Sequence, residues 1–169
     1  MNYSSNKRNS AKMIALLAVM CALALVMSYL EHFIPTPHPA IKIGLPNIVI
    51  VFILYRIGIP EAFAVSIIRV ILSSVLLGTI GSSLPYGLAG AVLSLMLMII
   101  LKSLKIFSTV TVSIIGGVSH IAGQVLVACL ILGSSKIVYI LPALSVTAII
   151  SGALVGTLGS LLIKRIKKI

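Results

Sequence analysis

The chain has 169 residues, of which 60% are hydrophobic and 9% charged, and its formal net charge is +11. Its mean hydropathy is +1.26, and several apolar runs of about 20 residues are each long enough to cross a hydrocarbon core of roughly 30 Å. These features exclude a soluble protein and predict an all-α, polytopic membrane protein. The length accommodates six spans with short connections and leaves no room for a soluble catalytic domain.

The first span is expected at residues 12–33, after a basic cytoplasmic N-terminal tail at residues 1–11. This segment resembles a secretory signal, but its apolar run continues past the small residues Ala22 and Ala24, so we expect a retained helix. Ala18 and Ala22 are four residues apart and form a small-residue face. Such a face either packs inside the protein or docks a partner helix.

The break after the first span, YLEHFIPTPHPAIKIGLPN at residues 29–47, concentrates prolines and ionisable groups between apolar runs. Prolines cannot occupy a regular helix interior, so the segment is expected to be extended. Because Glu31, His32, His38 and Lys42 are costly to keep near lipid, such groups usually line a site. We therefore expect this break to form the outer rim of a small-molecule pocket.

Five further runs follow, and with the first they predict a single six-helix transmembrane domain at residues 12–163. The second run is short and either spans the membrane or is re-entrant. Gly152 and Gly156 in the last run form a GxxxG pair, which we expect to pack within the bundle. The five runs cover residues 44–57, 60–79, 85–101, 108–132 and 137–163, followed by a basic cytoplasmic tail at residues 164–169.

The distribution of basic residues favours six spans over a re-entrant second run. With both termini in the cytoplasm, ten basic residues lie on the inner side and only Lys42 and Lys136 lie on the outer side. A re-entrant second run would place the basic tail outside, against the positive-inside rule. We expect a multi-pass protein of the cell membrane with both termini cytoplasmic, in contact with membrane lipids.

Polar residues that fall at the same membrane depth are the candidates for a substrate-binding site. Glu31 and Asn47 lie close to the outer surface, and Arg69 lies ten residues into its run. An unpaired arginine at the bilayer centre would cost at least ~2.5–3.5 kcal/mol. Either Arg69 forms an ion pair with Glu31, or Arg69 and Lys42 receive an anionic ligand group, because a guanidinium fork suits carboxylate or phosphate. The two interpretations can coexist.

His120 and Gln124 are four residues apart near the middle of the fifth span, so they share a helix face. They either line the pocket, form an interhelical hydrogen bond, or bind a metal. A lone buried histidine is more often a hydrogen-bonding residue than a metal ligand. We therefore expect no metal and no other cofactor.

Glu31 and Glu61 are the only acidic residues of the chain. A Mg²⁺-dependent prenyl diphosphate synthase needs clustered carboxylates around its metal, and no DDxxD-like cluster is present. No P-loop motif is present either, so ATP-driven transport would require a partner. The basic residues follow the ends of apolar runs, a pattern that indicates membrane topology and no nucleic-acid partner. We expect a chain that is not an enzyme.

Several segments resemble the Gx transporter family, which also carries the label heptaprenyl diphosphate synthase component I. They are YLEHFIPTPHPAIKIGLPNIVI, IIRVILSSVLLGT, GLAGAVLSLMLM, GGVSHIAGQVLVA and YILPAL. That family is similar to the S components of energy-coupling factor transporters, which are six-helix proteins that hold a vitamin-like ligand in an outward pocket. The resemblance implies that Ala18 and Ala22 dock a transmembrane coupling subunit driven by ATPases.

Three hypotheses follow from the sequence. The favoured one is a substrate-binding transport protein for a small, anionic, vitamin-like or isoprenoid- or quinone-related compound. The substrate-binding residues would be Glu31, Lys42, Asn47, Arg69, His120 and Gln124. The second is a non-catalytic membrane subunit of a prenyl diphosphate synthase. The third is a purely structural subunit, which predicts a collapsed interior with Arg69 fully paired.

Overall fold

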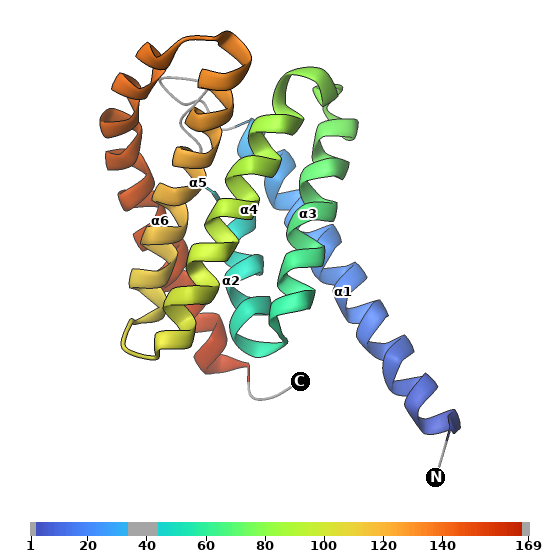
Figure 1. Cartoon of the computed structure of the whole chain (residues 1–169). Coiled ribbons are helices and arrows are strands. Elements are labelled where there is room, and N and C mark those ends of the chain that lie inside the picture. The colour runs from blue at the N-terminus through green and yellow to red at the C-terminus, as the bar shows by residue number, and fades with distance from the viewer. Residues whose placement is uncertain (1–2, 34–43, 167–169) are drawn as a thin grey trace.

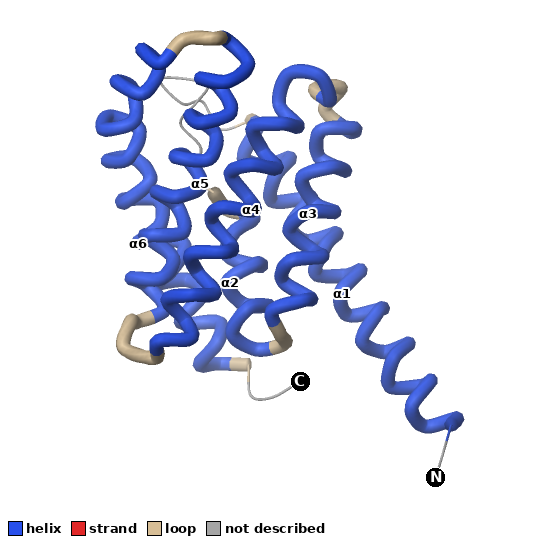
Figure 2. Tube along the Cα trace, viewed as in Figure 1, coloured by secondary structure: helices blue, strands red, loops and turns tan. Residues whose placement is uncertain are grey.

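The computed structural model describes residues 3–33 and 44–166, which form an almost entirely helical bundle (Figure 2). Within these residues, five segments are long and apolar enough to cross a membrane, and one apolar helix is shorter. The prediction of an all-α, polytopic membrane bundle is confirmed. The helices are α1 (Tyr3–His32), α2 (Pro46–Arg56), α3 (Ile59–Leu76), α4 (Ile80–Leu104), α5 (Thr109–Leu132), the 3-10 helix η1 (Ser135–Ile140) and α6 (Leu141–Arg165) (Figure 1).

The short helix α2 forms the centre of the bundle. Its 11 residues measure about 16 Å at 1.5 Å per residue, roughly half of a hydrocarbon core. Pro46 and all residues from Ile48 to Leu54 are buried, as expected for a helix that is apolar on every side. It contacts α1, α3 and α6, so protein rather than lipid surrounds it.

The direction of the chain supports six crossings of the bundle. α1 ends at one end of the bundle and α3 begins at the other, so the chain crosses the bundle between them (Figure 1). As a result, the N-terminal and C-terminal helix ends lie at the same end of the molecule (Figure 1). This arrangement disagrees with a re-entrant second run.

The predicted helix start at residue 60 agrees closely with the structure, whereas the predicted start at residue 85 does not. α3 begins at Ile59, after Gly58 and with proline in its first turn, and α6 also has proline in its first turn. α4 begins at Ile80, so the predicted start at Pro85 is wrong and the proline lies inside the helix. A proline in the second turn removes one backbone hydrogen bond. The first turn of α4 is still closed, because the Ser83 N–H donates to the Thr79 carbonyl.

Glycines allow α4, α5 and α6 to pack closely. A Cβ at Gly123 would lie 2.7 Å from the Ala89 carbonyl oxygen on α4. Cβ atoms at Gly152 and Gly156 would each lie 2.7 Å from a Cα atom of α5. The GxxxG pair therefore packs inside the bundle, as predicted, because small residues let membrane helices approach closely.

Candidate functional site

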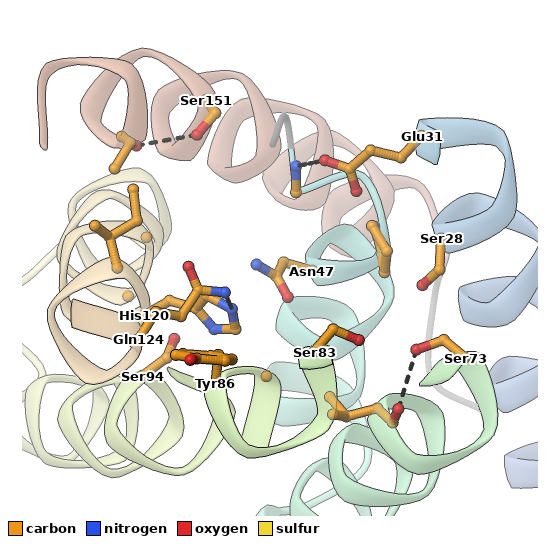
Figure 3. A pocket seen from close by; sticks show the side chains of 18 of the residues that line it. Ser28, Glu31, Asn47, Ser73, Ser83, Tyr86, Ser94, His120, Gln124 and Ser151 are labelled. Atoms are coloured by element: carbon orange, nitrogen blue, oxygen red, sulfur yellow. Dashed lines mark hydrogen bonds between the residues drawn. The ribbon is translucent and has the colours of Figure 1, made fainter. Parts of the chain in front are cut away.

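A cavity of about 680 Å³ lies among the helices (Figure 3). Its lining includes Thr79 from the α3–α4 turn and Ile140 of η1, so it reaches the end of the bundle away from the two termini (Figure 1). It extends inward as far as Val51 in the middle of α2. Pro46 and Asn47, in the first turn of the short α2, form part of the lining. The neighbouring helices extend past the start of α2 (Figure 1). The length of α2 therefore positions the cavity.

Arg69 lines the cavity from the middle of α3 and is only 9% exposed. Its Nε atom is buried and has no hydrogen-bond partner among the described residues. Glu31 is close enough to interact with it electrostatically. A buried donor without a partner carries a desolvation penalty. Arg69 can therefore offer a hydrogen bond and a positive charge to an anionic group inside the cavity.

Glu31 connects α1 to the start of α2. Its Oε1 atom accepts a hydrogen bond of 2.5 Å from the backbone N–H of Gly44. Gly44 has a φ of +75°, a conformation that favours glycine. Of the two interpretations of Arg69, an ion pair with Glu31 or an anion site shared with Lys42, the first is represented by this electrostatic interaction, while the Glu31 carboxylate hydrogen-bonds to the backbone of Gly44.

His120 and Gln124 face the cavity from α5, opposite Asn47 of α2 (Figure 3). The Nε2 atoms of His120 and Gln124 are 3.3 Å apart. The imidazole lies against α4, where a Cβ at Gly90 would come within 2.9 Å of its Nε2 atom. Both residues therefore line the pocket, and His120 also packs against α4, while the hydrogen bond between them lies within α5.

The structure brings five of the six predicted substrate-binding residues to one cavity. Lys42, the sixth, lies outside the described residues. Ala18 and Ala22 are exposed on α1 and are not part of the lining. Among the described residues no group of three or more His, Cys, Asp or Glu side chains could hold a metal ion. The five residues that line the cavity are Glu31, Asn47, Arg69, His120 and Gln124.

A set of hydroxyl groups also lines the cavity, and most of them were missed from the sequence. Ser74 and Ser83 are examples, and their hydroxyl oxygens are 3.5 Å apart across the α3–α4 pair. The signal was the density of Ser and Thr around residues 73–83. The cavity hydroxyls belong to Ser28, Ser73, Ser74, Thr79, Ser83, Tyr86, Ser94, Ser113 and Ser151.

A family model described as heptaprenyl diphosphate synthase component I matches residues 20–162. The matched region includes every described residue that lines the cavity. Comparisons with curated proteins and with solved structures find no match. The family match therefore applies to the whole site and to nearly the whole bundle.

Proposed function

The chain belongs to the heptaprenyl diphosphate synthase component I family, and from this premise we propose that it binds a small anionic molecule as the substrate-binding component of a transport system. The observation that carries the proposal is a buried arginine, with an unpartnered Nε atom, lining a cavity of about 680 Å³. Ionisable residues inside membrane bundles usually mark substrate pathways. Ligand pockets are commonly about 300–1,000 Å³ in volume, with a few converging polar groups.

The proposed roles follow from the contacts. Arg69 receives the anionic group, because a guanidinium donates paired hydrogen bonds to carboxylate or phosphate. Asn47 from α2, and His120 and Gln124 from the opposite helix α5, orient the rest of the ligand (Figure 3). The Glu31 carboxylate partly balances the positive charge of Arg69 and accepts a hydrogen bond from Gly44, directly before α2. That Lys42 provides a second positive charge for the anionic group remains a prediction.

The charges at the two ends of the bundle support an outward-opening cavity. Arg56 and Lys102 lie at the end that carries both termini, together with the basic end of α6, whereas Lys136 lies in η1 at the other end. Cytoplasmic ends of membrane helices carry the excess of Lys and Arg. The cavity would then face away from the cytoplasm in the cell membrane, and uptake would deliver a compound from outside.

Energy for uptake would come from a partner, since the sequence has no P-loop. Ala18 and Ala22 are exposed on α1, which contacts only α2 and α3 extensively. A small-residue face on a peripheral helix suits close approach by another transmembrane helix. We propose this face as the docking site for a membrane coupling subunit driven by ATPases.

A second candidate function is a non-catalytic membrane subunit of heptaprenyl diphosphate synthase, and the description of the family favours it. In that function the chain would hold a soluble catalytic subunit near its lipid product. It predicts co-purification with a synthase that carries the aspartate clusters, and higher prenyl-transfer activity on reconstitution. A purely structural subunit is disfavoured, because it requires a collapsed interior and a fully paired Arg69.

The test is a ligand screen on the purified protein in lipid nanodiscs. Anionic vitamins and isoprenoid or quinone precursors are tested by thermal shift, and any hit is repeated with Arg69→Gln. Loss of at least ~10-fold in affinity is expected, since charge-assisted hydrogen bonds contribute about 1.5–3 kcal/mol. Arg165→Gln, on an exposed residue at the end of α6, is the matched control. Undiminished binding by Arg69→Gln would exclude this residue as the anion site.

A further inference from the structure

The cavity lining is divided into a polar side and an apolar side. The polar side comes from α1 to α4 and carries Glu31, Asn47, Arg69 and the hydroxyl groups of the α3–α4 pair, among apolar residues such as Val70 and Leu77. The apolar side comes from the outer half of α5, from η1 and from the start of α6. It consists of Val125, Ala128, Ile137, Ile140, Leu144 and Ala148.

The apolar side offers little hydrogen bonding to a ligand. Ser151 is the hydroxyl residue that α6 adds to the described lining, and it donates to the Ala148 carbonyl of its own helix at 3.2 Å (Figure 3). Val125 and Ala148 belong to a buried cluster with Ile121, against which Ile137 and Leu144 pack. This part of the cavity therefore matches hydrocarbon and not a second polar group.

His120 and Gln124 lie between the two sides. They extend from the same helix as Val125 and Ala128 but face Asn47 across the cavity (Figure 3). A ligand in this cavity can contact these two side chains. Its polar portion can hydrogen-bond to them, and a portion between α5 and α6 contacts a lining in which Ser151 is the hydroxyl residue from α6.

We propose that the ligand is an amphiphile, with an anionic head group at Arg69 and a hydrocarbon tail between α5 and α6 beneath η1. This inference rests on the proposed function, because it assigns the substrate class of the same site. It excludes small hydrophilic anions as the preferred ligand, since they would leave the apolar side in contact with water. Burial of the tail would supply affinity in proportion to its length.

The experiment measures affinity for linear alkyl monophosphates of increasing chain length, with inorganic phosphate as the head group alone. The full chain is used in nanodiscs, and binding to protein-free nanodiscs is subtracted to remove membrane partitioning. Affinity should rise about fourfold for each added methylene until the apolar side is filled, from the burial energy of a CH₂ group. The same series with alkyl carboxylates distinguishes the two head groups.

Two substitutions localise the tail. Ala128→Phe fills the apolar side and should lower affinity for the longest members at least tenfold while leaving the shortest unchanged. Ala143→Phe adds the same bulk to an exposed position of α6 that does not line the cavity, and it should leave the whole series unchanged. Leu144→Asn, of similar size but polar, provides a second variant if Ala128→Phe lowers the melting temperature.

The outcomes separate the two proposals. Affinity that depends on Arg69 but not on chain length overturns the amphiphile and leaves anion binding in place. Chain-length dependence that Ala128→Phe and Leu144→Asn both leave unchanged also overturns the amphiphile, because the tail then lies elsewhere. Absence of binding in both the phosphate and the carboxylate series, together with no hit in the broader screen, overturns the proposed function as well.

Discussion

The Glu31 carboxylate on α1 accepts a hydrogen bond of 2.5 Å from the backbone N–H of Gly44, directly before α2. The same carboxylate acts electrostatically on Arg69 of α3. One side chain therefore links three helices at the cavity, through an acceptor atom in one direction and a charge in the other. Substitutions can separate these two contributions.

Glu31→Gln keeps an acceptor for the Gly44 N–H but removes the negative charge. We expect a melting temperature close to that of the wild type and tighter binding of an anionic ligand, because the Arg69 charge is no longer partly balanced. Glu31→Ala removes both contributions and should destabilise the fold by about 1–3 kcal/mol through the unsatisfied N–H. Thermal unfolding and ligand titration of both variants check this. Equal destabilisation by Gln and Ala would show that the charge, not the acceptor, holds α2.

Gly90→Ala should displace the His120 ring. The added Cβ would lie 2.8 Å from the His120 carbonyl oxygen and 2.9 Å from its Nε2 atom, so α4 and α5 must separate and the ring must move. Overpacking of this kind costs about 1–3 kcal/mol, and ligand affinity should fall as well.

Gly81→Ala is the matched control for Gly90→Ala, because it lies on the same helix with no atom within 4 Å of the added Cβ. Alanine is favoured over glycine in helices by about 1 kcal/mol, so this variant should be neutral or slightly stabilising. If Gly90→Ala behaves like Gly81→Ala in both melting temperature and affinity, the close packing of His120 against α4 is unimportant.

Lys102→Met should destabilise the end of the bundle that carries the termini. The Lys102 Nζ atom donates to the Leu54 carbonyl at 2.5 Å and lies 5.3 Å from the centroid of the Tyr55 ring. It thereby satisfies a carbonyl group in the last turn of α2. We expect a loss of about 1–3 kcal/mol, measured as a lower melting temperature.

Lys105→Met is the control for Lys102→Met. It removes one positive charge from the same end of the molecule, but from an exposed position, so the effect on membrane topology is matched. Similar melting temperatures for the two variants would indicate that the Lys102 hydrogen bond contributes nothing measurable.

Ala18→Leu with Ala22→Leu tests the docking face of α1. Both alanines are exposed, so the double variant should retain its melting temperature and its ligand affinity. Co-purification of the coupling subunit and ligand uptake should be lost, because leucine prevents close helix approach. Val19→Leu, on a residue that is 64% exposed, is the control. Undiminished uptake by the double variant would remove this face from the transport proposal.

The sequence by itself determined the class of protein, the number of helices and most of their ends. Hydropathy depends on local composition, and Gly58 with Pro60 marks a helix boundary through backbone chemistry that needs no tertiary contact. The positions of Arg69 and His120 near the middle of their helices also followed from counting along the chain. These are properties of single segments, and the sequence predicted them well.

The tertiary structure decided which faces of the helices point inward. Lipid is as apolar as a membrane protein interior, so hydrophobicity does not distinguish the two faces of a span. The rotation and packing of the helices decide which side chains line the cavity. They bring the hydroxyls of Ser74 and Ser83 and the apolar side around Val125 to the cavity, and they place the short α2 at the centre. That rotation is set by contacts such as Gly123 against Ala89, which join residues far apart in the chain.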